Sequence, residues 1–136
     1  MLAKLLVTGG SVITIGFGVW HFFVPRIWKW YSYIIPDATE LVLAARAINV
    51  LFSLSLVLFG LADIVLINSD LAEPFSVIVM LSATSILWLT RLVLQLVYPQ
   101  GSHRPAIRYG MLAVFVLVTV CFLLSLYIVS APSGAA

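Results

Sequence analysis

Four long apolar stretches constrain the fold of this 136-residue chain more than any other feature. They are Leu2–Val24, Leu41–Ile67, Phe75–Tyr98 and Ala106–Val129. A membrane-spanning helix needs about 20 mostly apolar residues, and each stretch meets that requirement. Unbroken apolar runs favour helices, because the strands of a membrane barrel alternate apolar and polar residues. The sequence therefore predicts an all-α integral membrane protein with four spans.

The composition excludes several classes of protein. The chain is 63% hydrophobic and 9% charged, whereas about 25% of the residues of a soluble domain are charged. The formal charge of +2 and the absence of a basic run exclude nucleic acid as a partner. Cys121 is the only cysteine, so an internal disulfide and a paired-cysteine redox centre are excluded. The first apolar stretch is longer than the core of a signal peptide, so we expect no cleavage.

The connections between the spans are short, and residues that break helices mark them. Short connections place successive helices antiparallel, which predicts one domain over residues 1–136, an up-and-down four-helix bundle. Basic residues gather in the first and third connections, as Arg26 and Lys29 and as Arg104 and Arg108. Because cytoplasmic loops are rich in Lys and Arg, we expect the plasma (inner) membrane with both termini outside, although Lys4 counts against this orientation.

The segment that follows the first span is rich in aromatic and basic residues. Its aromatic residues are Trp20, Trp28, Trp30, Tyr31 and Tyr33, and its basic residues are Arg26 and Lys29. Trp and Tyr favour the membrane–water interface, and basic residues favour anionic headgroups. We therefore expect the first helix to end at Pro25 and the chain to follow the interface until Pro36.

Polar residues within the spans recur at helical spacing, so each set lies on one face of its helix. Span two contains Arg46, Asn49, Ser53, Gly60 and Asp63, span three contains Thr84, Trp88, Arg91, Gln95 and Tyr98, and span one contains Gly10, Thr14, Gly18 and His21. Small residues at this spacing let helices approach closely. Span four has few polar residues and is predicted to face lipid the most, so exchanges at Leu117, Val118 and Leu124 should cost little.

Several of these polar residues are expected at one depth in the cytoplasmic half, at about 1.5 Å per helical residue. An arginine inside a membrane requires a partner. One interpretation pairs Arg46 and Arg91 with Asp37 or Glu40 near the headgroups, and the other is a pocket for a guest rich in hydrogen-bond acceptors. The candidate ligand-binding residues are His21, Arg46, Asn49, Trp88, Arg91, Gln95 and Tyr98. Asp63 falls near the opposite face, where we expect it to be solvated rather than to relay protons.

The sequence gives little support for a haem, a metal site or a serine nucleophile. A haem held by two histidines would need both within the bundle, but His103 lies in a connection. Metal ligands at suitable spacing are absent from the sequence, and the serines have no neighbouring base. A bound lipid and a quinone are the two kinds of cofactor that the sequence leaves as alternatives. The sequence identifies no catalytic residue.

The segment Gly18–Pro25, GVWHFFVP, resembles the G-x-x-H-F-x-x-P signature of the DoxX-like small membrane proteins. Those proteins also have four spans and a similar length. The resemblance implies a small subunit or accessory protein, in some members tied to quinone-linked redox complexes, and makes His21 the first position to test. The family usually has a glutamate followed by glycine in span two, where this chain has Arg46, Asn49 and Ser53.

Three functions are compatible with these features. The favoured one is a non-enzymatic binding or accessory subunit, in a larger membrane complex or a homo-oligomer, that holds a lipid headgroup, a quinone or a partner helix. A small transporter is an alternative, although four-span multidrug exporters have an acidic residue in span one and this chain has none. An integral membrane enzyme acting on a lipid-soluble substrate is the other, although thiol-based quinone reductases need paired cysteines.

Overall fold

The fold is a bundle of four long helices, seen in a computed structural model that describes residues 1–35, 37–101 and 104–131. The elements are α1 (Leu2–Ile27), a short 3-10 helix η1 (Trp30–Tyr33), α2 (Thr39–Asn68), α3 (Pro74–Val97) and α4 (Pro105–Ser130). Each of the four α-helices is long and apolar enough to cross a membrane. The predicted all-α four-span class is therefore confirmed. Pro36 and His103, named above, lie outside the described residues.

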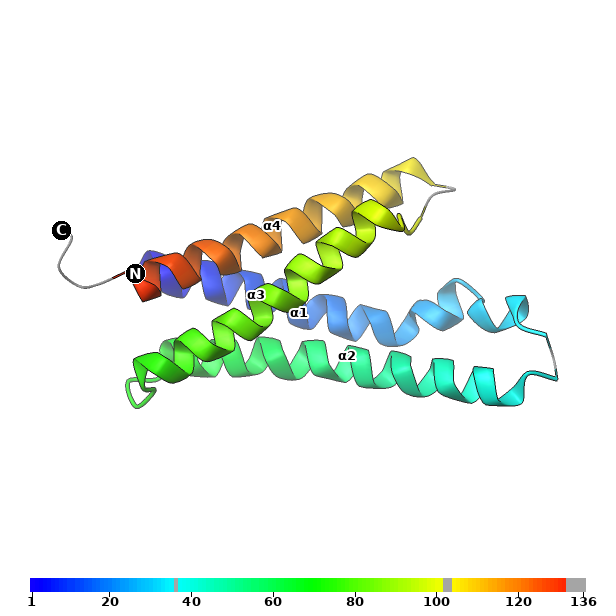
Figure 1. Cartoon of the computed structure of the whole chain (residues 1–136), viewed down its shortest axis with the longest axis horizontal. Helices are drawn as coiled ribbons and strands as arrows, with labels where there is room; N and C mark the ends of the chain where they lie inside the picture. The colour runs from blue at the N-terminus through cyan, green and yellow to red at the C-terminus, as the bar shows by residue number, and fades with distance from the viewer. Residues whose placement is uncertain (36, 102–103, 132–136) are drawn as a thin grey trace.

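The helices run up and down, so α1 begins and α4 ends at the same end of the bundle (Figure 1). We call this the terminal end, and we call the opposite end, where α1 ends and α4 begins, the connector end. In Figure 1, α2 follows α1 along its length, while α3 crosses the bundle. The helices α2 and α3 are joined at the terminal end and diverge toward the connector end.

Glycines allow α1 and α2 to pack at close range. A Cβ atom added at Gly60 would lie 2.6 Å from Ile15 Cγ1 and 2.9 Å from the Ser11 carbonyl oxygen. A Cβ atom added at Gly18 would lie 2.9 Å from Leu56 Cβ. No larger residue fits at either position without displacing its neighbours, so these glycines set the distance between the two helices.

The first helix does not end at Pro25, and that expectation was wrong. Proline lacks only its own N–H, and the helix continues through it to Ile27, where the Trp28 N–H still donates to the Val24 carbonyl at 2.9 Å. The chain then turns at Lys29, which has a positive φ of 52°. The aromatic helix η1 follows this turn, so the aromatic segment is displaced by about one helical turn from its predicted start.

The fourth helix is not the most exposed to lipid, as the sequence had suggested. Over its most apolar segment, it buries as large a share of its residues as α2 and α3 do. Its buried residues include Phe115, Val118 and Phe122, which are fully enclosed, and Phe122 packs over the backbone of Gly10. The prediction for Val118 was therefore wrong, because apolar rings on α4 fill the space that the small residues of α1 leave. Leu117 and Leu124 are about half exposed.

Candidate functional site

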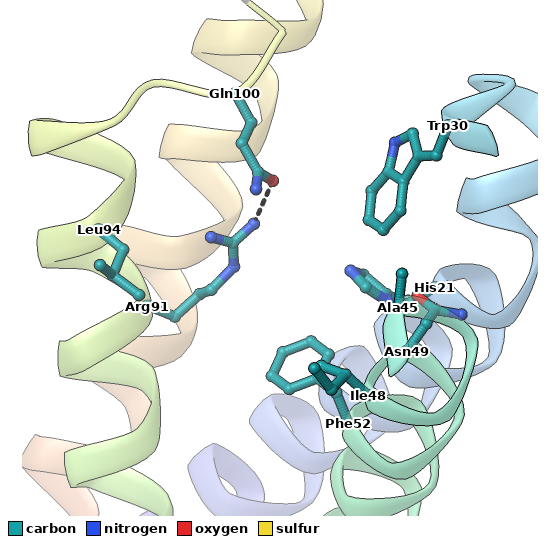
Figure 2. Close-up of a pocket in the computed structure, with 9 residues that line it drawn as sticks. All are labelled: His21, Trp30, Ala45, Ile48, Asn49, Phe52, Arg91, Leu94 and Gln100. Atoms are coloured by element: carbon teal, nitrogen blue, oxygen red, sulfur yellow. Dashed lines mark hydrogen bonds between the residues drawn. The ribbon is translucent and has the colours of Figure 1, made fainter. Parts of the chain in front are cut away.

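A cavity of about 390 Å³ opens at the connector end, where α2 and α3 diverge. Its walls come from α1, η1, α2, α3 and the connection after α3, as Figure 2 shows. They consist of His21, Trp30, Ala45, Ile48, Asn49, Phe52, Arg91, Leu94 and Gln100. The structure thus brings together three candidate residues from three helices: His21, Asn49 and Arg91.

The cavity opens sideways onto the apolar surface of the bundle. Ile48 on α2 is 66% exposed and Leu94 on α3 is 44% exposed, although both line the cavity. These residues belong to helices long enough to span a membrane, so their exposed faces are the faces that lipid would cover. The mouth of the cavity is therefore apolar where α2 and α3 border it.

His21 forms the wall contributed by α1. The Ser53 hydroxyl donates to the Asn49 carbonyl at 2.7 Å, and its oxygen lies 3.4 Å from His21 Nδ1. Because the serine proton is already used, the Ser53 oxygen can accept a hydrogen bond from His21 Nδ1 when that nitrogen carries the proton. The imidazole ring also packs edge-on against Phe52 at 4.9 Å and Trp30 at 6.2 Å, so this wall is aromatic with one polar edge.

Arg91 forms the opposite wall and extends from α3 toward Gln100 (Figure 2). It donates to the Gln100 side-chain oxygen, and its guanidinium carbon lies 4.8 Å from the centre of the Phe115 ring. Within the described part of the chain, Arg91 Nε is buried without a hydrogen-bond partner, and so is Asn49 Oδ1. The contacts shown for Arg91 are with neutral groups rather than with Asp37 or Glu40.

Two candidate residues support the cavity from outside its lining. Gln95, which is 2% exposed, donates to the Gln100 carbonyl at 3.1 Å and accepts from the Gln100 N–H at 3.3 Å. This pair of bonds holds Gln100 where its side chain meets Arg91. Trp88 is fully buried, donates to Thr14 Oγ1 at 3.0 Å and packs against Phe115, which lies under Arg91.

Two other candidates are placed apart from this cavity. Tyr98 is 73% exposed and does not line it. The guanidinium carbon of Arg46 lies 4.9 Å from the Tyr31 ring centre, in a separate cavity that also includes Arg26. The two arginines that the sequence placed in one group therefore face different spaces, and Asn49 lines both.

The residues predicted for the membrane interface are all at the connector end. Some of them line cavities, and others are exposed. Trp20 and Trp28 line a further cavity between α1 and α4, together with Arg104. Trp30 lines the Arg91 cavity, while Tyr33 is 84% exposed and Lys29 forms the turn before η1. Their aromatic rings and charges are thus available at one end of the bundle, as an interfacial belt requires.

Asp63 is not solvated, contrary to expectation. It is 1% exposed and accepts a hydrogen bond of 2.8 Å from Thr84 Oγ1 on α3. The sequence position, near the end of α2, had suggested access to water. It is buried because α3 lies against α2 at this level, where Thr84 contacts the carboxylate.

The sequence did not predict the apolar lining of the cavity, nor the contact of Arg91 with Gln100 in the connection after α3. Ala45, Ile48 and Leu94 cannot be distinguished in sequence from residues that face lipid. Gln100, a polar residue after a helix-ending proline, lies in the third connection, and its position in the sequence did not indicate a role in the cavity.

Among the described residues, no group of three or more His, Cys, Asp or Glu side chains is placed to hold a metal ion. In comparisons with known proteins, no family model, curated protein or solved structure matches this chain.

Proposed function

We propose that this integral membrane protein is a binding or accessory subunit that holds one amphiphilic molecule in the Arg91 cavity. The polar head of the guest lies between Arg91 and Asn49, and its apolar part leaves between α2 and α3. The observation that supports this proposal is the pair of buried polar atoms without partners, Arg91 Nε and Asn49 Oδ1, beside a mostly apolar cavity. A buried donor and a buried acceptor without partners are costly unless a guest satisfies them.

The cavity favours a head group that accepts hydrogen bonds. A guanidinium donates to carbonyl, carboxylate or phosphate oxygens, and these bonds are stronger when the donor is charged. The rings of His21, Phe52 and Trp30 offer flat apolar surfaces beside this donor. A quinone has carbonyl oxygens on a flat ring, and a phospholipid has ester and phosphate oxygens, so both have the required chemistry. The resemblance of Gly18–Pro25 to the DoxX-like proteins adds support for an accessory role near quinone-linked complexes.

The test compares two arginines that line different cavities. The wild-type chain, Arg91→Leu and Arg46→Leu are purified in mild detergent, and co-purified lipids and quinones are quantified by mass spectrometry. We expect the amount of ligand that co-purifies with Arg91→Leu to fall by at least about tenfold, because a hydrogen bond to a charged group contributes about 1.5–3 kcal/mol. Its fold is retained, since the change removes a charge from the membrane. Arg46→Leu, which removes the same charge outside this cavity, keeps its ligand.

The identity of the bound mass distinguishes a quinone from a phospholipid. Equal ligand content in all three proteins would contradict the binding function. Lower thermal stability of both variants without a change of ligand would favour the interpretation that the arginines only stabilise the helix ends.

We also propose that the chain lies in the plasma (inner) membrane with the connector end in the cytoplasm. Arg26 in the last turn of α1, Arg108 in the first turn of α4, and Lys29 and Arg104 in the connections place basic residues at the connector end, which supports this orientation. Single cysteines at Ser32 and Ser69, in a chain with Cys121→Ala, are treated in intact cells with a membrane-impermeant thiol reagent. We expect labelling at position 69 and protection at position 32, and the reverse result would contradict the orientation.

A small transporter is the second candidate, and the burial of Asp63 is the observation that favours it. An ionisable side chain enclosed within membrane helices is typical of ion and proton pathways. This candidate differs from a binding subunit in requiring movement of a substrate across the membrane. A flux assay with the chain in sealed vesicles would separate the two.

A further inference from the structure

The buried hydroxyl groups of the bundle fall into two classes. They belong to Ser11, Thr14, Ser53, Thr84, Ser85, Thr119 and Ser125. Four of them donate to the carbonyl four residues earlier in their own helix, at 2.7–2.8 Å: Thr14, Ser53, Thr119 and Ser125. This bond is the usual way in which a hydroxyl is satisfied inside a membrane helix. Ser11, Thr84 and Ser85 are the exceptions.

The three exceptions lie at the level of Asp63 in the terminal half of the bundle. Thr84 donates directly to Asp63 Oδ2 at 2.8 Å, and Ser85 follows it in α3. On α1, the Ser11 carbonyl faces Gly60, one turn before Asp63 on α2. Side chains tilt toward the N-terminus of their helix. In antiparallel α1 and α2, this tilt moves the Ser11 and Asp63 side chains toward each other.

Three buried oxygens at this level have no hydrogen-bond partner within the described residues: Asp63 Oδ1, Ser11 Oγ and Ser85 Oγ. Two of them are hydroxyls that do not form the backbone bond that four equivalent groups form. A buried carboxylate without a compensating charge is strongly unfavourable. The same region therefore combines a buried carboxyl group with two buried hydroxyl groups that lack a hydrogen-bond partner among the described residues.

We propose that Asp63, Thr84, Ser11 and Ser85 form a second site that binds a monovalent cation of the size of sodium. Carboxylate and hydroxyl oxygens are ligands for hard cations. One carboxylate balances one positive charge, whereas a divalent ion would leave an unbalanced charge in the membrane. A proton on Asp63 would also neutralise the carboxylate, so the dependence of stability on sodium and on pH distinguishes the two occupants.

The experiment measures the thermal stability of the full chain in detergent by tryptophan fluorescence. Samples contain sodium, potassium or choline chloride at equal ionic strength, so that general screening is constant. Because a ligand that binds only the folded state stabilises it, Tm should rise with sodium concentration and then saturate. We expect a rise of several degrees in sodium relative to choline and a smaller rise in potassium.

Variants assign the effect to the site. Asp63→Asn, which keeps the shape and removes the charge, should abolish the sodium response, and Ser85→Ala should shift it to higher sodium concentrations. Ser125→Ala, a buried serine whose hydroxyl bonds to its own helix, should respond like the wild type. Binding of radioactive sodium to the wild-type chain, displaced by unlabelled sodium, tests the site even where a variant fails to fold.

Two results would overturn the proposal. One is a wild-type Tm that is the same in sodium and choline, with no displaceable sodium bound. The other is an Asp63→Asn chain that retains the full sodium response. A Tm that changes with pH but not with sodium would assign the carboxylate to a proton alone and would equally contradict a cation site.

Discussion

The terminal half and the connector half of this bundle use the same helices in opposite ways. In the terminal half, Gly10 and Gly60 let neighbouring helices approach until the Phe122 ring and the Ile15 side chain contact the backbone. In the connector half, α3 diverges from α2, and side chains with large rings or charges line the space. The difference teaches that, in this bundle, glycines mark where neighbouring helices pack closely, while the Arg91 cavity lies where larger side chains face one another across diverging helices.

The two halves also differ in the charge that they bury. The terminal half encloses the carboxylate of Asp63 among hydroxyl groups, whereas the connector half places the guanidinium of Arg91 beside a cavity. Each charge lies near polar atoms without partners in the described residues. The carboxylate of Asp63 is enclosed, so its immediate surroundings suit a small ion, whereas the cavity beside Arg91 has room for an amphiphile.

The largest effect is expected from opening the closed half. Phe122→Ala removes a fully buried ring that packs over Gly10 and should lower the free energy of unfolding by about 3–5 kcal/mol. Leu124→Ala, on the same helix and 48% exposed, is the control and should cost about 1 kcal/mol or less, because contacts with lipid replace those lost. Reversible unfolding in detergent measures both, and similar losses would show that α4 is uniformly enclosed.

A smaller effect is expected from forcing α1 and α2 apart. Gly60→Ala places a methyl group 2.6 Å from Ile15 Cγ1 and should destabilise the fold by about 1–3 kcal/mol. The matched control is Gly16→Ala, where no atom lies within 4 Å of the added group. That control should be neutral or gain up to about 1 kcal/mol, since alanine favours helices more than glycine does. Equal stability of the two variants would disprove the role assigned to Gly60.

The sequence predicted those features that follow from one helix at a time. Four spans and their antiparallel order came from apolar length and short connections, and the spacing of His21, Asn49 and Arg91 placed them on inward faces. What it could not predict depends on two helices together. The burial of Val118 and Asp63, the separation of Arg46 from Arg91 and the divergence of α3 all follow from how neighbouring helices fit, which no spacing within one helix records.

The smallest effect on stability is expected from filling the open half. Ala45 lines the cavity, so Ala45→Leu places apolar atoms in empty space rather than against the backbone and should change the free energy of unfolding by less than about 1 kcal/mol. The same change should strongly reduce the amount of co-purified ligand, because it takes the volume that the guest would occupy. Ala44→Leu is the control, since Ala44 is exposed and outside the cavity lining, and its ligand content should equal that of the wild type. Thermal unfolding and mass spectrometry on the same samples separate the two quantities. A loss of stability from Ala45→Leu as large as that from Gly60→Ala would mean that the connector half is packed as tightly as the terminal half, and the contrast between them would fail.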